Sequence, residues 1–290
     1  MNNTTESEKF VSKKERRAID RRSTYSFQDV VGNVWEADRW LGSGGFGDVY
    51  ECGNNLVIKI QPKDLLKNEI ETYLRLTSPN VPNIVAFGQN AKEGFIVLPR
   101  YKQTLNKPYN ESLVYKYMAD VVLVLKDIHN DSFYHGDVKP ANIVIDDTDT
   151  ASLIDFGLAG RLRTDRSRFR LGGTVSYMSI DQHERRRPTR RSDLESLGWS
   201  LCSLKNKVGM KRKSKTEYLS LKTEAKLNPE KFFNEYLPNE PLAQKFLLKV
   251  WSLKYFEIPN YVELAKLLKA EEPQHVYDED EQRRLYSDEN

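Results

Sequence analysis

The chain has 290 residues, of which 39% are hydrophobic and 30% are charged, and its formal net charge is +3. This length suits one large domain, or two lobes that share a core, and excludes several independent modules. The composition is typical of a soluble globular protein, because no apolar run is long enough to cross a membrane and the polar N-terminus has no secretory signal. Cys52 and Cys202 have no metal-ligand spacing, which predicts a reducing compartment, the cytosol or the nucleus.

Hydrophobic periodicity predicts a β-rich lobe followed by a helical lobe, so the expected fold class is α+β. Residues 1–33 lack an apolar period and are predicted to be a mobile basic tail. Residues 34–98 are predicted to form strands at 34–41, 49–52, 56–60, 84–88 and 95–98, with one helix at 65–76. Residues 102–270 are predicted to contain short strands at 143–145 and 152–154 and helices at 113–129, 194–204, 215–226, 229–236, 241–251 and 261–268. An acidic tail follows at 271–290, and the junction of the two lobes is the expected ligand site.

A glycine-rich segment lies between two expected strands and runs through Leu41, Gly42, Gly44, Gly45, Gly47 and Val49. A strand on each side argues against a dinucleotide-binding turn, which would lead into a helix. The context favours a β-hairpin over nucleotide phosphates, because glycine lets the backbone approach phosphate oxygens. An ordinary glycine-rich hairpin is the alternative.

A single lysine, Lys59, interrupts the apolar run 56–60. It is either a solvated side chain or a cation that binds phosphate. Its expected partner is Glu69 and the competing carboxylate is Glu71. Glu69 lies one turn before Tyr73 on the apolar face of the predicted helix, so it points inward better than Glu71. A solvated glutamate on the helix surface is the alternative.

Two polar motifs follow in the helical lobe. Residues 135–142 read HGDVKPAN and supply a carboxylate in Asp137, a cation in Lys139 and an amide oxygen in Asn142. Asp155 begins the second motif, Asp-Phe-Gly, directly after an expected strand. A base, a cation and two metal-binding oxygens are the groups that phosphoryl transfer from ATP requires.

With these motifs in this order, residues 35–270 resemble the eukaryotic protein kinases. The resemblance implies a two-lobed fold with ATP and Mg²⁺ bound between the lobes. It also implies that Asp137 is the catalytic base and that Asn142 and Asp155 hold Mg²⁺. Lys139 would neutralise the transferred phosphoryl group, with Thr174 beside it, and a lysine there is the serine/threonine pattern.

Within the kinases, residues 153–159 (LIDFGLA), 179–181 (SID) and 190–198 (RRSDLESLG) resemble the casein kinase I group. Gly136, where many kinases have arginine, and residues 179–183 (SIDQH) are similar to the vaccinia-related kinase branch, so both branches stay open. Casein kinase I proteins usually have an arginine within 251–253, and this chain has none.

The resemblance also implies a hinge that binds adenine after the strand 95–98. Leu98 aligns with the gatekeeper, and adenine would contact the carbonyl of Pro99 and the N–H of Tyr101. Pro99 lacks an N–H but keeps its carbonyl, so the pattern is retained. Asp193 is predicted to cap the backbone of the catalytic loop, a role compatible with a plain helix N-cap.

The predicted function is a serine/threonine protein kinase acting as a monomer on protein substrates. The alternatives are a pseudokinase scaffold and a small-molecule phosphotransferase. Arginines within 161–170 and 185–191 predict a preference for acidic or phosphorylated peptides, with a solvated basic surface as the alternative. Basic segments at 13–17 and 211–213 are candidates for nuclear import or nucleic-acid contact, or are solvated charge runs.

Overall fold

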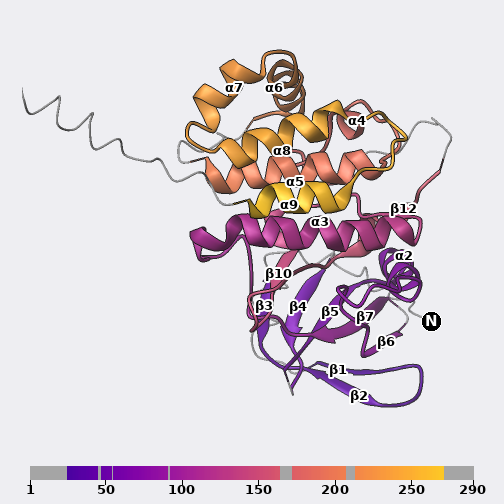
Figure 1. Ribbon diagram of the computed structural model, residues 1–290. Coiled ribbons are helices and arrows are strands. Elements are labelled where there is room, and N and C mark those ends of the chain that lie inside the picture. Colours follow the sequence, from indigo (N-terminus) through magenta and orange to yellow (C-terminus); the bar gives the residue numbers. More distant parts are fainter. Residues whose placement is uncertain are drawn as a thin grey trace, which may run out of the picture.

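The structure is a computed structural model that describes residues 25–44, 47–53, 55–90, 92–163, 172–206 and 213–270. It has a β-rich lobe and a helical lobe, as predicted (Figure 1). The basic segment 13–17, the acidic tail 271–290, the arginines of 164–170 and most of the basic segment 211–213 lie outside the described residues.

A five-stranded antiparallel sheet forms the centre of the β-rich lobe, in the order β3-β4-β5-β7-β6. Its strands are β3 (Trp40–Ser43), β4 (Asp48–Glu51), β5 (Leu56–Pro62), β6 (Ala86–Gln89) and β7 (Glu93–Pro99). Successive side chains of a strand point to opposite faces. On β5, Ile58 and Ile60 therefore pack in the core of one face, while Lys59 and Gln61 point to the other face.

A hairpin of β1 (Tyr25–Gln28) and β2 (Val34–Ala37) covers the face of the sheet that contains Ile58 and Ile60. Two predictions about the start of the β-rich lobe were therefore wrong. The folded chain begins before residue 34, and the expected strand 34–41 divides into β2 and β3, which belong to different sheets. Phe27 packs against Phe95 at 5.2 Å between ring centroids. Asp29 orders the turn by accepting hydrogen bonds, and the bond from Trp35 lowers the pKa of Asp29 to about 2. β1 has only four residues, of which Phe27 alone is buried, so its sequence shows no clear apolar period.

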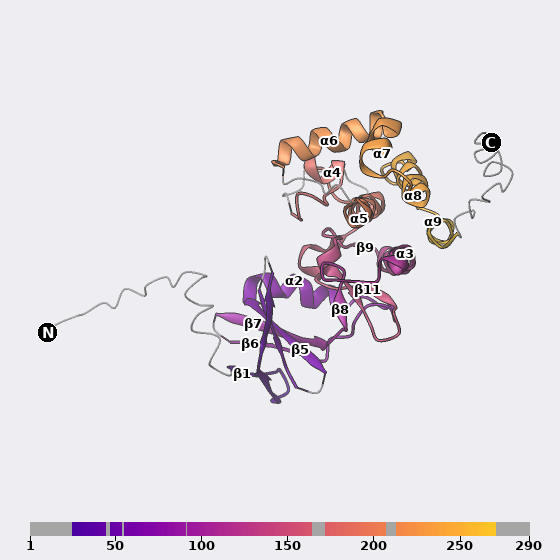
Figure 2. The same cartoon turned by 90° about the vertical axis from the view of Figure 1, so that its left-hand side faces the viewer.

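The second face of the sheet is covered by α2 (Lys63–Tyr73), which begins directly after β5. Figure 2 shows α2 on the side of the sheet that faces the helical lobe. Its buried residues include Leu66, Glu69 and Tyr73. Since Lys59 points to this face, the fold brings a strand lysine and a helix glutamate together in the interior.

The helical lobe is built around α5 (Arg190–Lys205), in which every residue from Ser192 to Cys202 is buried. It packs against α3 (Val114–Asn130) and α8 (Pro241–Ser252), and α9 (Tyr261–Lys269) packs against α3 (Figure 1). The other elements of the lobe are α4 (Ile180–His183), α6 (Lys215–Leu227), α7 (Pro229–Tyr236), η1 (Glu111–Leu113), η2 (Pro140–Asn142), η3 (Phe156–Leu158), β8 (Gln103–Thr104), β9 (Phe133–Tyr134), β10 (Ile143–Ile145), β11 (Ala151–Leu153) and β12 (Gly160–Arg161). None of the helices in the described ranges is long and apolar enough to cross a membrane.

Candidate active site

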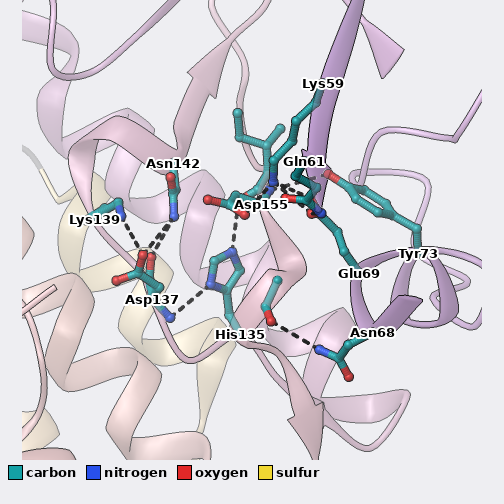
Figure 3. Close-up of polar contacts among 12 residues, drawn as sticks. Lys59, Gln61, Asn68, Glu69, Tyr73, His135, Asp137, Lys139, Asn142 and Asp155 are labelled. Atoms are coloured by element: carbon teal, nitrogen blue, oxygen red, sulfur yellow. Dashed lines mark hydrogen bonds and ion pairs between the residues drawn. The ribbon is translucent and has the colours of Figure 1, made fainter. Parts of the chain in front are cut away.

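The two lobes are joined by a buried ion-pair network around Lys59 (Figure 3). Lys59 Nζ lies 2.9 and 2.7 Å from the carboxylate oxygens of Glu69 and 2.8 Å from Asp155 Oδ1. Gln61 donates a further hydrogen bond of 2.9 Å to Glu69. Glu71, the competing carboxylate, is exposed and lies 4.0 Å from Lys67. The expected Lys59–Glu69 pair is therefore present.

Burial and neighbouring charges shift the pKa values of this network in opposite directions. The Lys59 side chain is 12% exposed and the Glu69 side chain is fully buried. Burial alone would lower the pKa of Lys59, but the charges of Glu69 and Asp155 outweigh it and raise this pKa above its ordinary value. Burial likewise opposes ionisation of Asp155, and the charge of Lys59 outweighs it and lowers the pKa of Asp155. Lys59 and Asp155 are therefore charged at neutral pH.

Asp155 is directed toward Lys59 by the packing of the next residue. Asp155 has φ of +70°, which is uncommon for a residue with a side chain. Phe156 is fully buried between Tyr73 of α2 and His135, with ring centroids 4.8 and 5.0 Å away. The hydroxyl of Tyr73 accepts a hydrogen bond from the Asp155 N–H at 3.4 Å. These contacts hold the Asp-Phe-Gly motif against α2.

The catalytic-loop candidates form a second cluster around Asp137. Lys139 Nζ contacts Asp137 Oδ2 and donates a hydrogen bond of 2.9 Å to Thr174 Oγ1. The Thr174 N–H donates to Asp137 Oδ1 at 2.8 Å. Asn142 donates to the Asp137 carbonyl at 3.0 Å. All four residues predicted from the sequence for this loop thus lie together, with the Asp137 carboxylate in a fixed orientation.

Asp193 of α5 holds the backbone that precedes Asp137. Its carboxylate accepts hydrogen bonds from the N–H groups of His135 at 2.7 Å and Gly136 at 2.9 Å. His129 Nε2 lies 2.9 Å from the same carboxylate. The expected cap of the catalytic-loop backbone is present, and the carboxylate also binds a histidine of α3.

Two side chains that the sequence analysis missed join these segments. Asn68 of α2 donates hydrogen bonds to the carbonyls of Gly157 at 3.2 Å and Ala159 at 3.0 Å. Gln182 donates to the Gly136 carbonyl at 2.8 Å. The position of Asn68 next to Glu69 was the available signal for the first contact, but nothing in the sequence indicated which carbonyls these amides bind.

Gly136 adopts φ of +81° and lies close to the segment after the Asp-Phe-Gly motif. A Cβ atom at this position would be 2.7 Å from the backbone carbonyl oxygen of Leu158. Both observations require glycine, because a side chain would be strained and would displace the backbone. The arginine that many kinases have here does not fit this structure.

The glycine-rich segment joins β3 and β4 next to the strand of Lys59. Val49 pairs directly with Lys59 across the sheet, so the two side chains share a face. A Cβ atom at Gly47 would lie 2.3 Å from the Ile60 carbonyl oxygen, so this position requires glycine. Gly45 lies outside the described residues, and the other predicted residues of the segment, Leu41, Gly42 and Gly44, are in β3 or directly after it.

The predicted hinge follows β7. Pro99 is the last residue of this strand and pairs with Leu56 of β5. The Arg100 N–H donates to the Asn55 carbonyl at 2.9 Å, so this N–H is engaged within the protein. Tyr101 is half-buried at the start of the connection to the helical lobe. The two residues predicted to contact adenine thus lie where the described chain passes from the β-rich lobe to the helical lobe.

Asn142 and Asp155 fit a magnesium site that is completed by phosphate oxygens. Because Asn142 uses its amide N–H group on Asp137, its oxygen remains for a cation. Asp155 uses Oδ1 on Lys59 and accepts no hydrogen bond at Oδ2 within the described ranges. No group of three or more acidic, histidine or cysteine side chains suited to a metal occurs there either. Mg²⁺ usually needs only one or two protein carboxylates beside substrate phosphates and water.

Comparison with known proteins decides the family, because residues 35–254 match the protein kinase domain. The chain belongs to the protein kinase family. Two poxvirus relatives have similar lengths: the probable serine/threonine-protein kinase FPV212 of fowlpox virus is 28% identical and the B1 kinase of monkeypox virus is 29% identical. Each alignment covers 83% of this chain and 94% of the relative.

The relatives include members of both kinase branches that the sequence resembles. Casein kinase I homolog 1 of Saccharomyces cerevisiae is 28% identical over 200 residues, which are 58% of this chain and 37% of the relative. The predicted resemblance to casein kinase I and vaccinia-related kinases is therefore confirmed as a distant relationship. The predicted two-lobed protein kinase fold is also confirmed.

Proposed function

We propose that this protein transfers the γ-phosphoryl group of Mg-ATP to serine and threonine hydroxyls of proteins. The observation that carries the proposal is the 2.8 Å contact between Lys59 of the β-rich lobe and Asp155 of the helical lobe. This contact brings a charged lysine and a magnesium-binding carboxylate together across the lobes. Phosphoryl transfer depends mainly on positioning and charge stabilisation, and these two residues supply both.

Each residue of the site has a separate role in the proposal. Lys59 binds phosphate oxygens, while Asn142 and Asp155 supply oxygens to Mg²⁺, which neutralises charge that develops on the phosphates. Asp137 accepts the hydroxyl proton of the substrate. Lys139 stabilises charge near the transferred group, and its bond to Thr174 fixes its position.

Serine and threonine are the proposed acceptors for two reasons. Lys139 stands two residues after the catalytic aspartate, which is the serine/threonine pattern of the family. The fowlpox relative is named a probable serine/threonine kinase. A pseudokinase scaffold, the alternative, is disfavoured because Lys59, Asp137 and Asp155 are all retained.

We expect purified protein to transfer labelled γ-phosphate to casein or histone in the presence of Mg²⁺. The label should be found on phosphoserine and phosphothreonine after acid hydrolysis. The matched control is Asp137→Asn, which keeps the side-chain size and removes the base, and should lower the rate by at least about a hundredfold. Equal labelling by the wild type and Asp137→Asn, or label on phosphotyrosine alone, would contradict the proposal.

We further propose a preference for acidic or phosphorylated substrates. Arg161 and Arg185 are exposed, and Arg161 pairs with Phe133, which lies just before the catalytic loop. Arg191 is not available, because it donates two hydrogen bonds of 2.8 Å to Asp181. Arg186 also lies 2.8 Å from a carboxylate, that of Glu184. Among the described arginines of the predicted basic surface, Arg191 and Arg186 are thus engaged by carboxylates of the protein itself.

Peptides with aspartate near the acceptor serine should be phosphorylated about threefold faster than neutral peptides at low salt, and the difference should shrink at high salt because exposed charges are screened. Arg161→Gln should reduce the preference. The control is Lys249→Gln, since Lys249 is on α8 and pairs with Glu263 at 2.7 Å. Equal rates on both peptides at both salt concentrations would remove this part of the proposal.

A further inference from the structure

A lysine of α6 is buried beneath the segment that follows Thr174. Lys222 is 0% exposed, which is rare for lysine. Its Nζ atom donates a hydrogen bond of 2.5 Å to the Met178 carbonyl and lies 3.5 Å from the Val175 carbonyl. The ammonium group also lies 5.1 Å from the centroid of the Trp199 ring. Lys222 therefore binds the backbone of residues 175–178.

A carboxylate of α5 binds the next part of the same segment. Glu195 accepts a hydrogen bond of 3.0 Å from the Ile180 N–H and one of 3.2 Å from Trp199. At its other end, the segment begins at Thr174, whose N–H donates to Asp137 at 2.8 Å. Residues 174–180 are thus bound by the catalytic cluster at one end and by Lys222 and Glu195 at the other.

The buried cation has a large electrostatic cost. Burial lowers the pKa of Lys222 to about 7, although the charge of Glu195 opposes the shift. The other titratable groups that face Lys222 are Cys202 of α5, Tyr218 of α6 itself and His183 of α4. Burial lowers the pKa of His183 to about 4, so His183 is neutral at pH 7 and lies 3.5 Å from the ammonium group without adding charge.

An apolar pair in place of Lys222 and Glu195 would avoid this cost, because replacing two interacting buried charges by packed apolar side chains is often neutral or stabilising. The lysine is therefore poorly explained by stability. What it supplies is a pair of donors for backbone carbonyls in the segment that borders the catalytic base.

We propose that Lys222 is a positioning residue that holds residues 175–178 in the conformation that receives the protein substrate. This inference rests on the proposed function, since it concerns substrate binding for the same reaction. Lys222 contacts neither Asp137 nor Lys59 in the structure, and it acts through the backbone. Its removal should therefore change the use of the protein substrate and leave ATP binding unchanged.

We expect Lys222→Met to raise KM for a peptide substrate about tenfold, the loss expected for a hydrogen bond from a charged donor. KM for ATP should stay unchanged. Lys222→Arg, which keeps a cationic donor, should recover part of the peptide KM. The matched control is Lys226→Met, which changes an exposed lysine one turn later on α6 and should have no effect on either KM.

The thermal stability of Lys222→Met distinguishes a positioning role of Lys222 from a purely structural one. The pKa of Lys222 is lowered in the folded state from 10.5 to about 7, so the wild type gains stability as pH rises from about 7 to 10.5. Lys222→Met lacks this dependence, and its unfolding midpoint relative to wild type should be higher at pH 6 than at pH 9. A midpoint for Lys222→Met more than about 5 °C below wild type at pH 7 would assign Lys222 to the fold and overturn the proposal.

Hydrogen exchange tests the contact without any need for activity. Amides of residues 175–180 should exchange faster in Lys222→Met than in wild type or Lys226→Met. If wild type transfers phosphate but Lys222→Met keeps wild-type KM and exchange, this inference fails while the proposed function stands. If wild type transfers no phosphate, the proposed function fails, and exchange still reports whether Lys222 holds the segment.

Discussion

Lys59→Met should lower the rate of phosphoryl transfer by at least about a hundredfold and cost about 3–5 kcal/mol of folding free energy. The loss of rate follows from removing the cation of the interlobe network. The loss of stability has a different cause. Glu69 is fully buried, and without Lys59 its carboxylate would keep only the hydrogen bond from Gln61. An unpaired buried charge is among the most destabilising features of a protein interior.

A double variant separates the two effects. Lys59→Met/Glu69→Leu also removes the fully buried carboxylate, so most of the lost stability should return, because the carboxylate that remains without Lys59, that of Asp155, is 21% exposed. Activity should not return, since the cation is still missing. Urea unfolding would give the stabilities of the single and double variants, and transfer of labelled phosphate would give the rates.

The control for the single and double variants is an exposed lysine of the same lobe. Lys67 is 80% exposed and lies 4.0 Å from Glu71. Lys67→Met should change the folding free energy by less than about 0.5 kcal/mol, because surface pairs contribute little. The interpretation of Lys59 would be wrong if Lys59→Met were as stable as Lys67→Met, or if the double variant regained transfer.

The sequence predicted contacts correctly where the periodicity of a strand or helix shows which way a functional side chain points. Lys59 lies on a strand that alternates between two faces, and Glu69 lies on the apolar side of a helix, so their meeting could be predicted. The short motifs around Asp137 and Asp155 could be predicted because each places its polar groups within a few residues. The structure joins Lys59 to Glu69 and Asp155, and it joins Asp137 to Thr174.

The sequence was uninformative where a contact depends on long-range packing. The hairpin that begins at Tyr25 is held by a few side chains of two four-residue strands, chiefly Phe27 and Ala37, which are too short to show a periodic pattern. Lys222 is one of several lysines within the predicted helix 215–226, and nothing in the sequence distinguishes it from the others. Its burial depends on how α6 packs against α4 and on the position of Trp199 of α5, and local periodicity does not contain that information.

One departure from the family has a structural explanation that the sequence did not reveal. No arginine is present at 251–253, where casein kinase I proteins usually have one. Arg191, from the start of α5, donates a hydrogen bond of 3.1 Å to the Leu253 carbonyl and binds Asp181 with two further bonds. A different arginine thus joins these two parts of the helical lobe.

Asp193→Asn should destabilise the fold by about 3 kcal/mol and lower the rate of transfer, although the side chain keeps its size. Asp193 Oδ1 accepts from the Gly136 N–H, and Oδ2 accepts from the His135 N–H. An amide has one oxygen, so in either orientation its NH₂ group must face one of these backbone donors. One buried N–H loses its partner, and the backbone immediately before Asp137 shifts. Chemical unfolding and kcat at saturating ATP are the measurements.

The control for Asp193 is Asp147→Asn, because Asp147 is exposed and the same chemical change there removes no buried acceptor. It should leave stability and kcat at wild-type values. In Asp193→Asn, the fall in kcat should exceed any change in KM for ATP, because the glycine-rich hairpin and Lys59 belong to the other lobe. Wild-type stability and kcat in Asp193→Asn would mean that the catalytic loop keeps its conformation without this carboxylate, and that the loop is held mainly by Gln182 and by Thr174.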